Sequence, residues 1–169
     1  EVLVFSTDPI TGTVKDIGSH SIHITANDLA ASGAEPVGVM LTMLLTPETR
    51  EEELKEMMRG VEKACQELNM EVMGGHTEIT DVVKQPLISV TGVGKIKKEA
   101  VLTTSSVKPG QDIVITKWIG LEGTMILARE KEKELLTRYP LPLIKAAQGF
   151  EKYLPILPEA ATALKSGVY

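Results

Sequence analysis

The chain contains few aromatic residues and a single cysteine. Aromatic side chains make up 4% of its 169 residues, and the cysteine is Cys65. One cysteine cannot form a disulfide within the chain, so we expect Cys65 to pack in the core as part of a helix. The formal charge is −5, and the lysines and arginines are spread out with few aromatics among them. This composition argues against a nucleic-acid partner.

Long apolar runs and several familiar catalytic motifs are also absent. No run of about 18 apolar residues occurs, which predicts no membrane span, and the opening EVLVFSTDP lacks the basic start and apolar stretch of a signal peptide. We therefore expect a cytoplasmic protein with no membrane partner. There is no Gly-x-Ser-x-Gly elbow, no Cys/His nucleophile pattern and no glycine loop that ends in Lys–Ser/Thr.

What is present fits one soluble domain, or one domain and part of another. The hydrophobic content is 43%, enough to build a core over this length. We expect a boundary near residue 108, because the pattern changes there to helix upon helix. Residues 1–108 would form the first domain and residues 109–169 the start of a second.

The apolar patterns predict a mixed α/β fold. Strands are expected at residues 2–7, 36–45, 71–73, 86–95 and 113–117. Pro9 should end the first strand and leave Asp8 at its end. The run at 36–45 is almost continuously apolar, which is typical of a central strand buried on both faces. Gly92 and Gly94 indicate a bulge or a close backbone approach.

Capping residues and apolar spacing predict the helices. The first should cover residues 17–32, with Asp16 as its N-cap and Gly33 as its stop. The second should begin with Pro47 at its first helical position. A third is expected at residues 121–139, followed by two shorter pieces separated by prolines. The core stripe of the second helix comprises Leu54, Met57, Met58, Val61, Ala64, Cys65 and Leu68.

Polar residues interrupt the apolar pattern at three places. Asp8 follows a strand, Asn27 and Asp28 are adjacent within a helix, and residues 74–78 (GGHTE) follow a short strand as a tight glycine turn. Together these segments would supply oxygen ligands for magnesium, which needs only one or two carboxylates beside water and phosphate oxygens. The glycines would let backbone amides approach a phosphate. For each segment taken alone, ordinary turn formation is the competing interpretation.

Two other sites are conceivable. His20 and His23 share a helix face, with Asn27 one turn beyond His23, and His76 would complete a transition-metal site; the alternative is three ordinary histidines. Residues 120–124 (GLEGT) would bind an anion at a helix N-terminus. The alternative there is a simple strand-to-helix turn.

The ordered segments STDPITG, DIGSH…TANDLAASGAEPVGV, MGGHTEIT and PLISVTGVG resemble the AIR synthase-like superfamily. Its members include aminoimidazole ribonucleotide synthetase, thiamine-monophosphate kinase, selenophosphate synthetase and the hydrogenase maturation protein HypE. The resemblance to HypE-like or AIR synthase-related proteins is the strongest. The later segment KPGQDIVITKWIGLEGTMILA resembles the opening of the family's C-terminal domain.

The resemblance implies a mixed sheet flanked by helices, which pairs in a homodimer to close a β-barrel, and a site for ATP and Mg²⁺. Asp8 and Asp28 would be magnesium ligands, and Asn27 would lie beside the phosphates. The substrate would be a small molecule or a protein tail. The nucleotide or substrate side would be lined by Gly75, His76, Thr77 and Glu78, although relatives often carry an acid where His76 stands.

Parts of the family pattern are not found in this sequence. A GDDAAV-like segment would precede Glu1, and an Asp-x-Thr-x-Gly-Gly-like motif and the cysteine-bearing tail of HypE would follow Tyr169. We therefore expect a fragment that holds half of an ATP site. The whole protein would phosphorylate a substrate oxygen, as in the ATP-dependent dehydration of a carbamoyl group. The alternatives are a thiamine-monophosphate kinase, an AIR synthetase, or a dimeric scaffold without catalysis.

Overall fold

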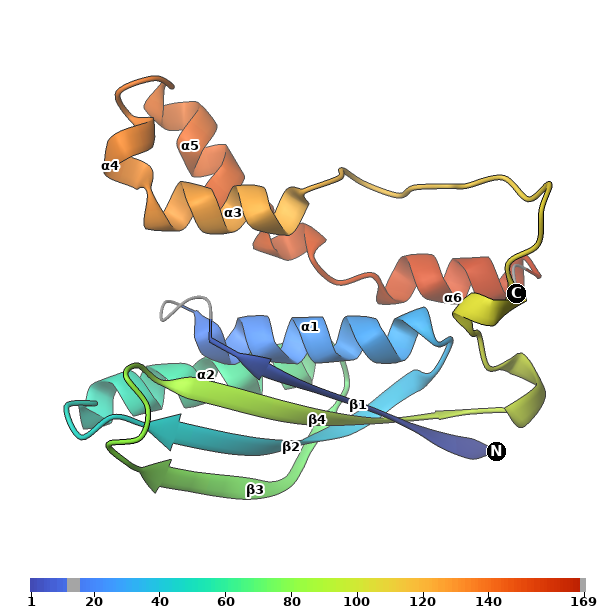
Figure 1. Cartoon of the computed structure of the whole chain (residues 1–169), viewed down its shortest axis with the longest axis horizontal. Helices are drawn as coiled ribbons and strands as arrows, with labels where there is room; N and C mark the ends of the chain where they lie inside the picture. Colours follow the sequence, from blue (N-terminus) through green and yellow to red (C-terminus); the bar gives the residue numbers. More distant parts are fainter. Residues whose placement is uncertain (12–15, 168–169) are drawn as a thin grey trace.

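The computed structural model describes residues 1–11 and 16–167, and its first part is a four-stranded mixed sheet (Figure 1). The strands lie in the order β1-β4-β2-β3, with β4 antiparallel to β1 and β2, and β2 parallel to β3. Their bounds are β1 (Val2–Ile10), β2 (Glu35–Leu45), β3 (Glu71–Ile79) and β4 (Leu87–Ile96). The mixed α/β class is therefore confirmed.

Two helices cover one face of this sheet, and a group of shorter helices follows. Helix α1 (Ile17–Ala31) contacts β1, β4 and β2, and α2 (Glu51–Glu67) packs beside α1 and reaches β3. The later segments are η1 (Lys98–Ala100), η2 (Thr104–Ser106), α3 (Leu121–Glu130), α4 (Glu132–Leu135), α5 (Leu141–Gln148), η3 (Gly149–Tyr153) and α6 (Leu157–Lys165). Among the described residues, none of these helices combines the length and the apolar character that a membrane crossing requires.

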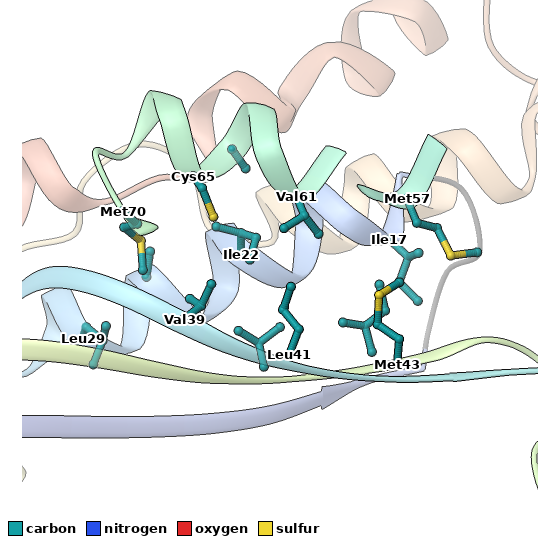
Figure 2. Close-up of a cluster of buried hydrophobic side chains, with 14 of the residues drawn as sticks. Ile17, Ile22, Leu29, Val39, Leu41, Met43, Met57, Val61, Cys65 and Met70 are labelled. Carbon is teal, nitrogen blue, oxygen red and sulfur yellow. The ribbon is translucent and has the colours of Figure 1, made fainter. Parts of the chain in front are cut away.

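The main core lies between the sheet and the helix pair (Figure 2). Cys65 is buried there, and burial raises the pKa of its thiol. The predicted stripe of α2 is correct except for Met58, which is 39% exposed. The side chains labelled in Figure 2 are Ile17, Ile22, Leu29, Val39, Leu41, Met43, Met57, Val61, Cys65 and Met70.

Glycines allow α1 to approach its neighbours closely. A Cβ added to Gly92 of β4 would lie 2.5 Å from the Thr25 Cγ2 of α1, so the predicted close approach is confirmed. On the other side of α1, a Cβ at Gly18 would overlap the carbonyl oxygen of Met57 in α2. Helix α1 is therefore held tightly between the sheet and α2.

The strand predictions need correction at several places. Strand β1 continues through Pro9 to Ile10, because β1 is an edge strand bonded only to β4 and loses little from a missing N–H. Strand β2 is central, but the helices cover only one of its faces, and Met40 on the other is 44% exposed. Residues 113–117 pair with no described strand, and Ile113 is 92% exposed.

The glycine segment at 74–78 is strand and not a tight turn. Strand β3 runs without a break from Glu71 to Ile79, and a register shift opposite Val39 and Met40 accommodates it beside β2. A Cβ at Gly75 would overlap the carbonyl oxygen of Leu41. Close strand contact, and not chain reversal, explains this glycine.

The helix limits also differ in places. Helix α2 begins at Glu51, and the Arg50 N–H donates to the Glu53 carboxylate at 2.8 Å, so Pro47 lies in the preceding turn. Asp16 precedes α1 as predicted but makes no side-chain cap. The expected helix at 121–139 is divided at Lys131 into α3 and α4.

Substitution of Gly18 tests the close packing of α1 on α2. We expect Gly18→Ala to lower the free energy of unfolding by about 1–3 kcal/mol, because the added methyl group meets backbone that cannot rotate away. Gly123→Ala in α3 is the matched control, since nothing lies near its added Cβ, and alanine should stabilise that helix by about 0.5–1 kcal/mol. Urea denaturation measures both. Equal stability of the Gly18 variant and the wild type would contradict the packing.

Candidate functional site

Two aspartates from different elements meet beside α1. In β1 the even-numbered residues face the helices, which puts Ser6 and Asp8 on the same side as Asp28 of α1. The Ser6 hydroxyl donates to Asp28 Oδ2 at 2.7 Å. The structure therefore brings together the two residues that were predicted as magnesium ligands.

The electrostatics of this pair favour a bound cation. A hydrogen bond with Asp28, partial burial and repulsion by the Asp28 charge raise the pKa of Asp8. Two close carboxylates that are both ionised repel each other, and either a shared proton or a cation relieves that repulsion. Carboxylate oxygens are also the donors that Mg²⁺ prefers. The donor set fits magnesium, with water and phosphate oxygens as its remaining ligands.

Asn27 lies next to this pair, but its amide is occupied by backbone. Its Nδ2 donates to the carbonyl oxygen of Leu154, and its Oδ1 accepts from the N–H of Ile156, both at 2.9 Å. In this arrangement Asn27 ties the segment before α6 to α1. Its contact with phosphates stays a prediction, and a phosphate would compete with these two bonds.

The predicted nucleotide-side residues lie on the far edge of the sheet. Gly75, His76, Thr77 and Glu78 belong to β3, whereas Asp8 belongs to β1. Three strand spacings separate β1 from β3, which amounts to about 14 Å. A single chain therefore does not bring them to the aspartate pair. His76 Nε2 lies 3.5 Å from the Glu78 carboxylate, and both side chains are exposed.

The three-histidine metal site is wrong. His20 and His23 are both buried on α1, but His20 Nε2 lies 3.1 Å from Glu122 and His23 Nε2 lies 4.0 Å from Glu67. His76 is exposed on β3. Across residues 1–11 and 16–167, no three or more His, Cys, Asp or Glu side chains gather as a metal cluster. The segment at 120–124 is a turn into α3, with Gly120 at a left-handed φ of 73°.

Sequence reasoning missed the polar contacts that join the ends of the chain. Arg129 of α3 forms ion pairs with Asp16 at 3.0 Å and Glu151 at 2.9 Å, and Ser19 donates to Glu151 at 2.7 Å. It also missed Ser6 as the partner of Asp28. The alternation within β1 was the available signal for Ser6, because it places residues 6 and 8 on one side.

Comparison with known proteins identifies the family. The model described as AIR synthase related protein, N-terminal domain, matches residues 1–96. The chain belongs to this family. The match ends at the last residue of β4, so it includes the whole sheet and both aspartates.

Curated relatives of the AIR synthase-related chain carry several activities. It is 28% identical over 130 residues to a putative hydrogenase expression/formation protein of Methanocaldococcus jannaschii, covering 74% of this chain and 39% of the relative. It is 33% identical over 118 residues to a selenide, water dikinase of the same organism, and the match covers 67% of this chain and 32% of that relative. The chain thus spans well under half the length of either relative.

Solved structures agree on the fold. A hydrogenase maturation protein HypE in complex with ATP matches with a TM-score of 0.70 and 25% identity, over 78% of this chain and 42% of that one. A thiamine monophosphate kinase from Aquifex aeolicus matches with a TM-score of 0.76 over 96% of this chain and 55% of that one. At 18% identity, the second match supports the fold alone.

Removal of one carboxylate should stabilise the metal-free protein. Because the pKa of Asp8 is raised above its ordinary 3.8, the pair is most stable at low pH and loses stability as the pH rises through that raised value. In EDTA at pH 7 we expect Asp8→Asn to raise the melting temperature by about 1–3 °C. Mg²⁺ should raise the melting temperature of the wild type and not that of the variant. If wild type and Asp8→Asn had identical melting curves in EDTA, that result would contradict repulsion between Asp8 and Asp28.

Proposed function

We propose that this chain is part of an enzyme that uses ATP and Mg²⁺ to phosphorylate an oxygen of its substrate. The observation that carries the proposal is the Asp8–Asp28 pair, with Ser6 fixing one carboxylate. Membership of the AIR synthase-related family and the similarity to an ATP-bound HypE support it. In this proposal residues 1–108 form the nucleotide-binding domain and residues 109–169 begin a second domain.

The roles of the site residues follow from charge and position. Asp8 and Asp28 would hold Mg²⁺, which when bound neutralises charge on the ATP phosphates. The Ser6 hydroxyl orients the Asp28 carboxylate by occupying its Oδ2. Asn27 would contact the phosphates only after giving up its bonds to Leu154 and Ile156. Positioning and charge neutralisation are the main contributions that a protein makes to phosphoryl transfer.

A HypE-like reaction is the specific form that we propose. A carbonyl oxygen of a carbamoyl group attacks the γ-phosphorus of ATP, the bond from that phosphorus to the β–γ bridging oxygen breaks, and ADP leaves. Loss of one N–H proton leaves an O-phosphorylated imidate, and loss of the second N–H proton with departure of the phosphate then forms a nitrile, which completes the dehydration. The similarities to HypE and to the hydrogenase expression/formation protein favour this substrate over a thiamine phosphate or a purine precursor. Because the reaction consumes ATP, we expect this activity in the cytoplasm.

Asp28→Asn in the full-length protein tests the enzymatic proposal. The variant keeps the size of the side chain but removes a magnesium ligand, so we expect Mg²⁺-dependent ATP turnover to fall by at least about 100-fold. Asp81→Asn, on an exposed turn after β3, is the matched control and should behave as wild type. Unchanged turnover in Asp28→Asn would refute the assignment. If the wild type gives neither heat nor a thermal shift with Mg-ATP, the non-catalytic scaffold is the better account.

The proposal also requires a second copy of the chain. The sheet face opposite the helices exposes a group of apolar side chains, including Leu3 and Phe5 of β1 and Met40 of β2. On the same face, the hydroxyl oxygens of Thr7 and Thr91 lie 3.0 Å apart and share a hydrogen bond. Burial of such a face against its copy would close a barrel and place β3 of one subunit beside β1 of the other, the strand that carries Asp8. Homodimerisation therefore accounts for the separation of the predicted site residues.

A charge on the open face should prevent this assembly. Phe5 is 60% exposed on an edge strand, and burial of a carboxylate there without a partner is unfavourable. We expect Phe5→Asp to sediment as a monomer at concentrations where the wild type is a dimer. Val82→Asp, at a site 78% exposed between β3 and β4, should remain dimeric. A wild type that is monomeric at high concentration would contradict the shared barrel.

A further inference from the structure

The helices that follow the sheet have an apolar core of their own. We call residues 121–154, from the start of α3 to the residue after η3, the α3–η3 unit. Figure 1 shows α3 on the side of α1 away from the sheet. The core of the unit is separate from the main core and consists of Leu121, Met125, Ile126, Phe150, Tyr153 and Leu154. The unit therefore keeps its own apolar packing if it separates from α1.

Polar contacts join this unit to α1. Ser19 donates to the Glu151 carboxylate at 2.7 Å, and His20 Nε2 lies 3.1 Å from Glu122. Asn27 holds the last carbonyl group of the unit at 2.9 Å. Helix α2, by contrast, shares the main apolar core with α1. Polar interfaces between separately packed units permit relative motion, so the α3–η3 unit leaves α1 more readily than α2 does.

His23 is buried where α1, α2 and η3 meet. The residue is 5% exposed and lines a polar cleft of about 580 Å³, with Lys63 of α2 and Lys152 of η3 among the other lining residues. Within the part of the chain that the structure describes, neither ring nitrogen has a hydrogen-bond partner. Glu67 Oε2, at 4.0 Å from Nε2, is too far for one. Both nitrogens are buried, so the closed junction withholds them from water.

An uncharged ring fits this position better than a charged one. A protonated imidazole has two N–H donors, and burial of a charge with unpaired donors is unfavourable. Burial accordingly lowers the pKa of His23. The carboxylates of Glu151 in η3 and Glu67 in α2 oppose this lowering of the pKa, while His20 of α1 and Lys63 of α2 add to it.

The two carboxylates near His23 are already engaged by other cations. Arg129 Nη2 lies 2.9 Å from Glu151, and Lys63 Nζ lies 3.8 Å from Glu67. A charged ring at His23 would have to compete with Arg129 and Lys63 for these acceptors. Water accommodates the proton on His23 better than the closed junction does.

We propose that the junction between α1 and the α3–η3 unit is a pH-sensitive switch, closed while His23 is uncharged and open once the ring is protonated and hydrated. The cleft already reaches the buried ring from outside, and movement of η3 away from α1 would admit water to its nitrogens. This switch is separate from the Asp8–Asp28 site and does not depend on the reaction assigned to that site.

The direction of the pH effect follows from linkage. In the open junction the pKa of the hydrated His23 ring is near its ordinary 6.5, and in the closed junction that pKa is lower. The open form therefore binds more protons, and the closed form loses stability as the pH falls below 6.5. His20 differs, because the Glu122 carboxylate 3.1 Å away gives a proton on that ring a partner.

Hydrogen exchange of the full-length protein at about pH 7.5 and about pH 5.5 tests the switch. Rates are first corrected for the intrinsic pH dependence of exchange. We expect the opening constant of amides in α3 and η3 to rise by up to about tenfold at the lower pH, which is the largest effect of one such histidine over this range. Amides of β4, in the main sheet, should change by less than about twofold and serve as the internal reference.

Removal of the titrating ring should abolish the rise. His23→Gln keeps a polar side chain, and His23→Leu supplies an apolar one in case the glutamine variant is unstable. In both variants the opening constant of α3 and η3 should change by less than about twofold between the two pH values. His76→Gln, at an exposed histidine of β3, is the matched control and should respond as wild type.

Any of three results would overturn the switch. The first is no rise in the wild type at the lower pH. The second is a rise of equal size in the His23 variants, which would assign the effect to another group. The third is equal opening of β4 and η3, which would indicate a general loss of stability and not the opening of one junction.

Discussion

The close packing of α1 is the constraint on which the rest of the structure depends. Gly92 lets the helix settle onto β4, and Gly18 lets the backbone of α2 approach from the other side. A shift of the helix would bring its backbone at Gly18 into the Met57 carbonyl of α2, or its Thr25 side chain into β4 at Gly92. Its polar residues are therefore held at fixed positions, and each faces a different neighbour.

The rotation of about 100° per residue in a helix explains this division of roles. His23 and Asn27 are four residues apart and lie on one side, toward the C-terminal segment: His23 is buried there, and Asn27 holds residues 154–156. Asp28, one residue further along, is rotated by about 100° and contacts Ser6 of β1. A single helix thus supplies one carboxylate of the pair and the anchor for the C-terminal segment.

Charge is concentrated where the helical segments join. Arg129 pairs with both Asp16 and Glu151 in a half-buried network, and Lys117 reaches Glu159 at 2.9 Å. At Asp8 and Asp28, by contrast, no described cation balances the two carboxylates. That imbalance is the physical reason to propose a magnesium ion there.

Local pattern was enough to locate most elements. The limits of α1, the strand at β4 and the buried side of α2 follow from periodicity and from Gly33, because these signals act over one or two turns of chain. The motif around Asn27 and Asp28 also indicated the family that the comparison then identified. Pro47 and residues 113–117 were misread, since a proline fits both a helix start and a turn, and an apolar run forms a strand only where a partner strand exists.

Residue type and spacing therefore located most of the elements, and the ordered motifs indicated the family and gave Asp8 and Asp28 as candidate ligands. Only the tertiary structure decided that Asp8 and Asp28 meet, that β3 lies at the opposite edge from β1, that Asn27 binds backbone, and that the ring nitrogens of His23 are buried without a hydrogen-bond partner among the described residues. Strand order and side-chain burial arise from contacts between residues far apart in the chain. No local pattern encodes them, and for that reason they could not be predicted from the sequence.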